Sequence, residues 1–522
     1  MLPKMRILLL AISLTLIHVG VGQANSPTFI SDKFTGKQTS AGFPANENGV
    51  YLIDRDVTLN EDIHLPSGCI IDFRGGCIKG NRTLWLNETF LTGKVKFQCK
   101  VRGSIENDRV NVKWFGAEDN GSINPKGYDS SKAFQIAIDF AEENNKELYV
   151  PTGYYGISKT LYVTKNKKCG IVGTESARPY IYALSSMDYM LTTKGDNGYG
   201  RKELRNLVFW GDNKSIGIND WHKYDCLAKY GCYFPDGYLY TRMSNVEFRF
   251  FSHWAFYANE IYDVHFNQIR VECCHNGIYL TGNVNGNSIT ESVFNKIMYF
   301  GIAANPSFML TIERNIFEVV GCAAIVMGTG CNFVVRNNYF EGTCVDGFVP
   351  MYFDNSKMPQ RLYADIITNG ATVSRIIDWG QKNENPKSKV FARTYSVSGI
   401  IEANTFQKDV KKDGLNCLVF STNLRDSKIR DNVLYNDRDL SNISVLGTCY
   451  KSNTSALVNV NVSNNVMSAT PLNRDVFIKR FQAMEKSGTT SKSHYLMNIT
   501  TDDIIASDQT ITTGQGIRSI IE

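Results

Sequence analysis

Between about residues 206 and 465, the chain repeats one short pattern of apolar and polar positions. Each copy has an apolar or β-branched pair, then an Asn, one spacer residue and a large apolar residue. A second apolar marker recurs in step with the first. The Asn positions are Asn267, Asn315, Asn338, Asn404, Asn432 and Asn465, and the second markers are Phe256, Ile278, Ile302, Ile325 and Phe348, spaced 22, 24, 23 and 23 residues apart. Two markers that share one period predict a solenoid, in which each repeat packs on the next.

The residues around each Asn predict how one coil is built. Ile312 and Phe317 flank Asn315 and are expected to point inward, with a turn at the Asn. Asn tolerates the left-handed backbone of such a turn. Stacked Asn side chains can also hydrogen bond to the neighbouring turn, which satisfies buried backbone groups. We therefore interpret the six Asn residues as structural, on strands that stack roughly 4.8 Å apart.

The rest of the chain divides around these repeats. Residues 1–24 contain Lys4 and Arg6, an apolar run and a small residue at Ala24, which is typical of a signal peptide of an exported protein. No later apolar run is long enough to span a bilayer. We expect a strand-rich leader or first coils at 25–112, the solenoid at 113–470 and a C-terminal cap at 471–522.

One amphipathic helix is predicted at about 129–144, just before the repeats. Asp129 or Ser130 can cap it, and an apolar stripe follows at helical spacing. The stripe consists of Ala133, Phe134, Ala137, Ile138 and Ala141. Because bare strand edges pair with other chains, we expect this helix to cover the first coil.

Three stretches resemble the opening of right-handed parallel β-helix proteins of the pectate lyase superfamily. They are Trp114–Gly121, Asp129–Ile138 and Leu148–Tyr155, the last of which ends in a Pro-x-Gly-x-Tyr turn. Ile71–Gly76 also resembles the leader of exported β-helix proteins from Bacteroides-type bacteria. Where the family usually has a DDT-like triplet, this chain has Asp129-Ser130-Ser131. The resemblance implies an all-β fold, namely a single-stranded right-handed parallel β-helix with a short N-terminal capping helix.

Charge and cysteine content narrow the range of partners. Removal of Lys4 and Arg6 takes the formal net charge from +5 to about +3, which gives little support for nucleic-acid binding. The 13 cysteines are odd in number, and Cys226 and Cys232 are the best local candidates for a disulfide. The oligomeric state is left open.

Alignment of the coils on the second marker brings aromatic residues together. His253, His275 and Tyr299 stand three positions before the marker, Trp254 stands two before it, and Tyr257 and Tyr279 stand one after it. Flat aromatic faces with interleaved hydrogen-bonding groups are suited to sugars. This wall is therefore either a glycan track or an aromatic ladder that supports a loop.

Acidic residues supply the candidate chemistry. Seven positions before the marker stand Arg249, Val271, Asn295, Glu318 and Glu341, so the last two would lie one coil apart. A close carboxylate pair is what a retaining glycosidase uses, although such a Glu can instead bond a turn amide. Asp346 and Glu260 are further candidate acids beside the track, and Arg336 aligns with Glu313 as an ion pair. Candidate sugar-contacting residues are Trp254, Tyr257, Tyr279, Tyr299, His222 and Arg336.

These patterns predict an exported carbohydrate-active enzyme that cleaves a glycosidic bond of a polysaccharide or oligosaccharide, by hydrolysis or β-elimination. Elimination would need a base, for which His253, His275 and Tyr279 are candidates, and often Ca²⁺. The Asp cluster of calcium pectate lyases and the Gly-Asp-Asp of polygalacturonase-like enzymes are not found in this sequence. The alternatives are a non-catalytic glycan-binding or adhesion protein and a purely structural exported protein.

Overall fold

The structure is a computed structural model of two compact units, Met1–Asn107 (unit 1) and Asp108–Glu522 (unit 2). It describes residues 28–29, 49–195, 202–214, 226–321, 323–328, 330–342, 362–368, 397–407, 415–421, 424–435, 443–451, 458–467, 494–499 and 510–511. The proposed signal peptide, residues 1–24, lies outside this range. No helix in the described part of the chain is both long enough and apolar enough to cross a membrane.

Unit 1 is itself a short parallel solenoid. Its strands are β1 (Thr28–Phe29), β2 (Val50–Ile53), β3 (Val57–Thr58), β4 (Ile63–His64), β5 (Ile70–Phe73), β6 (Ile78–Gly93) and β7 (Phe97–Ile105). Ile53, Phe73 and Gly93 stand at one level of successive coils, 20 residues apart. Along β6 the side chains alternate between buried and exposed, so Leu84 and Leu86 face the core.

Unit 2 contains the predicted repeats. Its elements in chain order are β8 (Arg109–Asn111), the 3₁₀ helix η3 (Val112–Phe115), α1 (Ser131–Asn144), β9 (Glu147–Val150), β10 (Tyr154–Ile157), β11 (Leu161–Thr164), β12 (Ile171–Gly173), β13 (Tyr180–Ala183), β14 (Met187–Lys194), β15 (Leu204–Trp210), β16 (Ala228–Phe234), β17 (Tyr238–Leu239), β18 (Arg242–Arg249), β19 (Trp254–Tyr262), β20 (His265–Asn267), β21 (Arg270–Asn285), β22 (Ser288–Thr290), β23 (Val293–Phe308), β24 (Thr311–Glu313), β25 (Ile316–Val320), β26 (Ala323–Met327), β27 (Gly330–Arg336), β28 (Tyr339–Glu341), β29 (Leu362–Thr368), β30 (Val397–Glu402), β31 (Thr405–Gln407), β32 (Leu415–Ser421), β33 (Arg425–Arg430), β34 (Val433–Tyr435), β35 (Ile443–Lys451), β36 (Val458–Ser463), β37 (Val466–Met467), β38 (His494–Ile499) and β39 (Thr510–Ile511).

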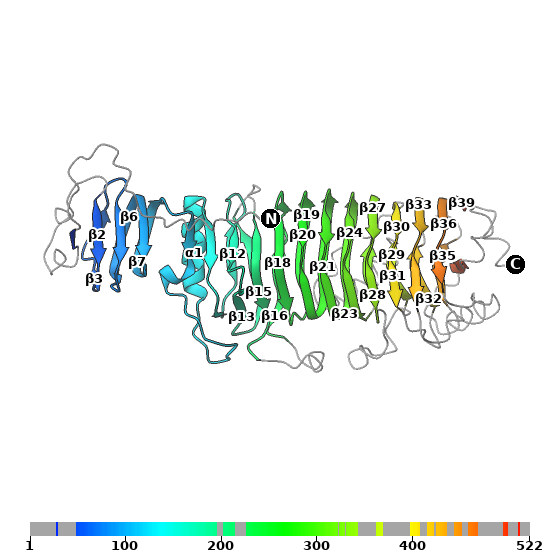
Figure 1. Ribbon diagram of the computed structural model, residues 1–522, viewed down its shortest axis with the longest axis horizontal. Coiled ribbons are helices and arrows are strands. Elements are labelled where there is room, and N and C mark those ends of the chain that lie inside the picture. The colour runs from blue at the N-terminus through cyan, green and yellow to red at the C-terminus, as the bar shows by residue number, and fades with distance from the viewer. Residues whose placement is uncertain are drawn as a thin grey trace, which may run out of the picture. The chain divides into compact units, whose positions relative to one another are not determined.

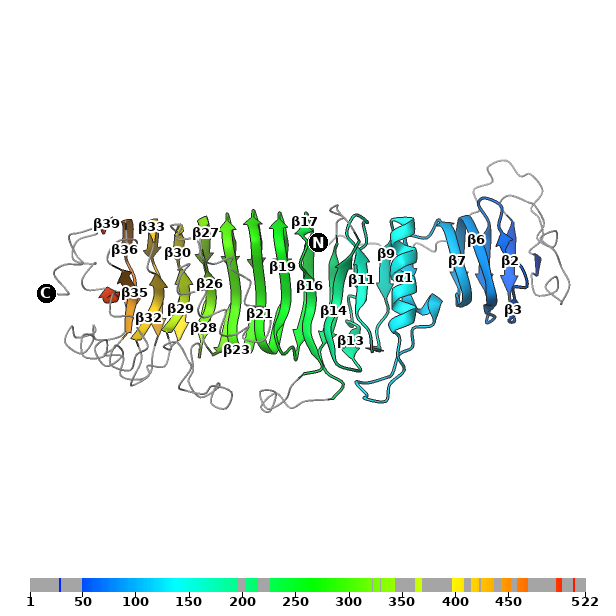
Figure 2. The same ribbon diagram turned by 180° about the vertical axis from the view of Figure 1, so that it is seen from behind.

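These strands form a right-handed, single-stranded parallel β-helix, as the sequence predicts. From β8 to β37, strands pair in parallel with strands of the next coil, so the strands of unit 2 stack side by side in Figures 1 and 2. The markers Phe256, Ile278, Ile302 and Ile325 lie in register on four successive coils. The next level is occupied by Ile366, and the predicted fifth marker, Phe348, lies outside the described residues. Ile366 follows Ile325 by 41 residues, so this step is longer than the period of the earlier levels.

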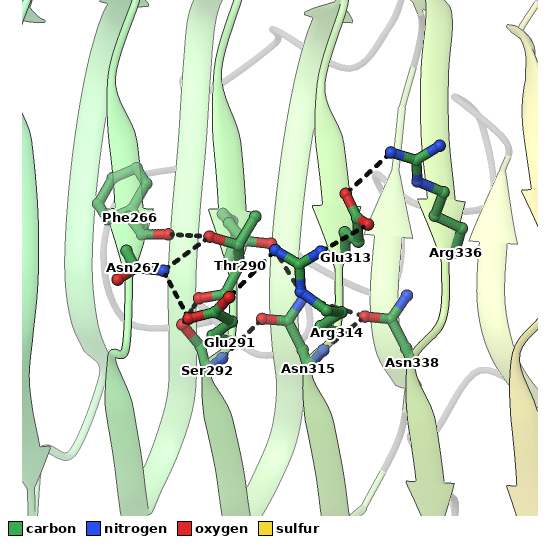
Figure 3. Close-up of polar contacts among 11 residues, drawn as sticks. Phe266, Asn267, Thr290, Glu291, Ser292, Glu313, Arg314, Asn315, Arg336 and Asn338 are labelled. Atoms are coloured by element: carbon green, nitrogen blue, oxygen red, sulfur yellow. Dashed lines mark hydrogen bonds and ion pairs between the residues drawn. The ribbon is translucent and has the colours of Figure 1, made fainter. Parts of the chain in front are cut away.

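The stacked Asn residues form a buried hydrogen-bonded ladder from Asn315 to Asn465. At each step, the backbone N–H and the side-chain Nδ2 of one Asn donate to Oδ1 of the next, as Asn315 does to Asn338 at 2.9 and 3.0 Å. The same Nδ2 also donates to a backbone carbonyl of the preceding coil. Figure 3 shows the start of the ladder, where the backbone N–H of Ser292 donates to Asn315.

Two details of the predicted Asn turn are corrected by the structure. The left-handed backbone belongs to the residue before the ladder position, as in Arg314 and Asn337, each with φ of 55°. Asn267 is not a rung, because it pairs with Thr290 on the sheet while Ile269 occupies the ladder position. The ladder thus selects Asn for its amide group rather than for left-handed geometry.

The predicted capping helix is confirmed as α1. Its apolar stripe is buried, and it packs against the first strands, β8, β9 and β11. Asp129 Oδ1 accepts hydrogen bonds from the backbone N–H groups of Ser131 and Ser158, which joins the helix start to the end of β10. The helix ends at Asn144, and the next residue, Asn145, caps it with left-handed backbone.

At the other end, most of the predicted C-terminal cap, residues 471–522, lies outside the described residues. The described part of this segment contains β38, which pairs with β35, and β39, which pairs with β36, both antiparallel. Buried Cys232 carries a free thiol, so the predicted Cys226–Cys232 bridge does not form.

Candidate functional site

Aromatic side chains from four successive coils form a continuous wall on unit 2. One row runs through Tyr189, Tyr233, Tyr257 and Tyr279, from β14, β16, β19 and β21. Tyr189 and Tyr233 stack with centroids 4.3 Å apart, and Tyr233 and Tyr257 stack at 4.7 Å. Tyr257 then meets Tyr279 edge to face at 5.3 Å. The predicted pair Tyr257 and Tyr279 is therefore brought together, and the aromatic row extends two coils further back than the alignment predicted.

A second row lies beside the first and contains both predicted histidines. Tyr230 lies 5.6 Å from His253, and His275 lies 5.8 Å from Tyr299 between ring centroids. Asn276 connects these coils because its Nδ2 donates to the His253 carbonyl at 2.8 Å. We call the two rows together the aromatic wall.

The wall changes the acid–base behaviour of His275. Burial, and secondarily the neighbouring His253, lower the pKa of His275 to about 4. The ring is therefore neutral at neutral pH, with one nitrogen that accepts and one that donates a hydrogen bond. A neutral imidazole can orient a sugar hydroxyl, whereas its low pKa makes it a weak base.

Trp254 does not lie open on the wall as the sequence predicts. Its side chain is only 1% exposed and packs against Tyr279 at 4.9 Å and Phe300 at 6.5 Å. Tyr279 is itself only 3% exposed. The alignment gave the level of Trp254 correctly, in register with Asn276, but could not show that rings of the following coils pack against it.

The predicted acid pair also lies in register. One row along unit 2 consists of Arg249, Glu272, Asn295, Glu318, Glu341 and Gln407, each pairing with the next. Glu318 and Glu341 are therefore neighbours on adjacent strands, β25 and β28. The prediction of Val271 in this row is wrong, because a bulge between Cys274 and Asn276 shifts the register and places Glu272 there.

Tyr339 completes this site, and the sequence alignment missed it. Its hydroxyl donates to Gln407 Oε1 at 2.7 Å. Burial, then a hydrogen bond and charge repulsion from Glu341, then the charge of Glu318, raise the pKa of Tyr339. The signal in the sequence was its place two residues before Glu341, because alternate residues of a strand share a face.

Ion pairing distinguishes the acids of this row. Glu272 is buried and held by Arg249, at 2.7 Å, and by Arg270, at 3.4 Å. Within the described residues, no Lys or Arg forms an ion pair with Glu318 or Glu341. The Glu272 carboxylate thus has a structural role in ion pairs, whereas Glu318 and Glu341 are the carboxylates of this row that could contact a substrate.

The acid row and the aromatic wall flank the same bend of the coil. Cys273, Lys296 and Val319 have left-handed backbone at this bend, with φ of 55–56°. On β23, for example, Asn295 of the acid row precedes the bend and Tyr299 of the wall follows it. A long chain molecule that crosses this bend would contact both.

Other candidates lie elsewhere. Glu260 has left-handed backbone at a later bend of its coil, between Asn259 and Ile261. Arg336 is held by Glu313 at 3.1 Å, on strands that precede the Asn ladder, as Figure 3 shows. His222 and Asp346 fall outside the described residues. Within the described part of the chain, no three His, Cys, Asp or Glu side chains gather as metal ligands.

Comparison with known families now adds to this geometry. Residues 109–349 match the family model described as rhamnogalacturonase A/epimerase, pectate lyase-like. This segment is therefore similar to the pectate-lyase-like family. None of the curated proteins compared with the chain gives a significant match.

Several solved structures are similar to this parallel β-helix protein. The Dettilon tailspike protein is 12% identical, with a TM-score of 0.47, over 69% of this chain and 62% of the tailspike chain. The chain therefore spans less than two thirds of the tailspike's length. DFA-IIIase from Arthrobacter chlorophenolicus A6, in complex with GF2, is 12% identical, with a TM-score of 0.47, over 76% and 91% of the two chains. PfbA, a surface adhesin of Streptococcus pneumoniae, is 13% identical, with a TM-score of 0.44, over 70% and 93%.

Proposed function

We propose that the chain is an exported glycoside hydrolase of a polysaccharide or oligosaccharide, with Glu318 and Glu341 as its acid pair. The observation that carries the proposal is their pairing on adjacent strands beside Tyr339, with no cation bound to either among the described residues. Strands one coil apart are separated by about 4.8 Å. This spacing fits the roughly 5 Å carboxylate separation of retaining enzymes, in which one acid protonates the leaving oxygen and the other attacks the sugar.

The aromatic wall gives this pair a substrate platform. Its rings belong to the coils before Glu318 and Glu341 and lie across one bend from the acid row. Tyr257 and Tyr299, which are both partly exposed, would contact the apolar faces of sugar rings, and neutral His275 would hydrogen bond to a hydroxyl. The match to a pectate-lyase-like family model, whose description includes a rhamnogalacturonase, supports a glycan as the substrate.

The test is a polysaccharide panel, read by new reducing ends and by absorbance of unsaturated uronate. Reducing ends without absorbance support hydrolysis, and absorbance would replace it by elimination. Glu318→Gln and Glu341→Gln should each lower kcat at least about 100-fold, because each removes an acid–base or nucleophilic group. Glu313→Gln is the matched control, since Glu313 is an ion-paired carboxylate on another face, and it should retain full activity. Full activity of both pair variants would falsify the assignment.

The aromatic wall also favours a second candidate function, namely glycan binding without cleavage. The stack of Tyr189, Tyr233 and Tyr257 lies on coils before the acid pair and could hold a glycan without cleavage. Binding of a glycan, together with no product from any member of the panel, would support this adhesive role instead.

A further inference from the structure

Unit 1 carries an exposed aromatic stack, formed by Trp85 and His64, that has no part in the proposed catalytic site. Trp85 on β6 is 39% exposed, and its indole lies parallel to the His64 ring on β4, with an interplanar angle of 5° and centroids 5.4 Å apart. The two residues pair in register on adjacent coils. The stacking fixes the plane of the indole and covers one of its faces, while the rest of the side chain remains partly exposed.

Polar side chains surround this stack at regular spacing. Arg102 on β7 pairs in register with Trp85, and Lys100 pairs with Thr83 two residues earlier on the same face. Asp62 Oδ1 accepts a hydrogen bond from the Thr83 N–H at 2.8 Å, which anchors the neighbouring turn. The buried residues between them, Leu84 and Val101, face the core. We call His64, Thr83, Trp85, Lys100 and Arg102 the Trp85 patch.

We infer that the Trp85 patch is a glycan-binding site in which a pyranose ring stacks on the indole. A flat aromatic face with hydrogen-bond donors at its rim suits the apolar face and hydroxyl groups of a sugar. One ring pair is far smaller than the roughly 800 Å² per partner of a stable protein interface. Residues 49–107 contain eight Lys or Arg and seven Asp or Glu, so the unit lacks the basic excess of a nucleic-acid site.

This inference goes beyond the proposed function, because it concerns a separate unit and requires no cleavage. It can be tested with the full chain in the Glu318→Gln/Glu341→Gln background, so that no glycan is consumed. The tryptophans, six in number, are replaced by 5-fluorotryptophan, and Trp85→Phe identifies the Trp85 fluorine resonance. Polysaccharides of neutral and acidic composition are then titrated, and the shift of that resonance gives an affinity at this site alone.

The expected result is a saturable shift of the Trp85 resonance with at least one polysaccharide. His64→Ala should weaken that affinity about tenfold, because it removes the ring that orients the indole. Phe90→Ala is the control, since Phe90 is 44% exposed in the same unit but pairs with Ile70 on another face, and it should leave the affinity unchanged. A Trp85 resonance that no polysaccharide moves, or equal effects of the two Ala variants, would overturn the inference.

Discussion

Single asparagine side chains connect successive coils of unit 2 through hydrogen bonds that are closed to water. Asn404 is fully buried and bonds in three directions, to the Val335 carbonyl, to Asn338 and to Asn432. A buried polar group that loses its partner costs about 1–3 kcal/mol. Each Asn of the ladder therefore contributes to stability mainly because it supplies hydrogen-bond partners to buried groups on the neighbouring coils.

Replacement of Asn404 by Ala should be strongly destabilising. It leaves the Asn338 N–H groups and the Val335 carbonyl without their partners, so we expect a loss of about 3 kcal/mol or more in the free energy of unfolding. Asn267→Ala is the control, because the Asn267 side chain is half-buried and, among the described residues, donates to the side chains of Thr290 and Glu291 rather than to a buried rung. Urea unfolding of both variants measures the difference, and equal losses would contradict the role of the ladder.

The low pKa of His275 makes stability depend on pH. Its folded-state pKa, about 4, lies below the value of about 6.5 expected in the unfolded chain, so the unfolded chain binds the proton more readily between these values. Stability should therefore be lost as the pH falls from about 6.5 to about 4. Thermal midpoints across this range should fall more for the wild type than for His275→Gln. Parallel curves for the two proteins would argue against a buried, neutral imidazole.

At the scale of elements, phenylalanine stacks and charged rows hold neighbouring strands in register. Inside the coils, Phe294, Phe317, Phe340 and Phe406 stack with centroids 4.6–5.0 Å apart. Outside, Glu313 bonds to Arg314 and Arg336, as Figure 3 shows. Exposed ion pairs contribute little to stability, so the rings provide most of the cohesion.

The capping helix provides a direct test at this scale. Phe134 is fully buried and its ring meets Tyr155 at 5.6 Å, which attaches α1 to β10. Phe134→Ala should cost about 3–5 kcal/mol and expose the first coil. Ile136→Ala, two residues away and 37% exposed, should change stability by less than about 1 kcal/mol. Unfolding midpoints together with light scattering will compare the two, and a stable, monodisperse Phe134→Ala protein would argue against the cap.

At the scale of the whole molecule, the chain forms two units with separate cores. Phe73, whose ring meets Phe97 at 5.3 Å, belongs to the core of unit 1, and Phe317 to that of unit 2. Calorimetry should therefore show that Phe73→Ala lowers one unfolding transition and Phe317→Ala the other. A single transition that both variants move equally would mean that the units unfold together.

The repeat period was sufficient to predict the fold, because one side chain per coil must face the core at each level. It placed Phe256 to Ile325 and the pair Glu318–Glu341 correctly. It failed at Val271, because a constant offset does not register a bulge, and it could not give the longer step from Ile325 to Ile366. It also could not give the burial of Trp254, which depends on rings from later coils.

The unequal steps between levels have a consequence for variation in this protein. Ile325 follows Ile302 by 23 residues, yet Ile366 follows Ile325 by 41 and still pairs with it. Register therefore depends on which strands pair on successive coils, and it does not depend on the number of residues between those strands. We therefore expect additional sequence inserted between β28 and β29 to be tolerated, because the pairing of the neighbouring strands sets their register.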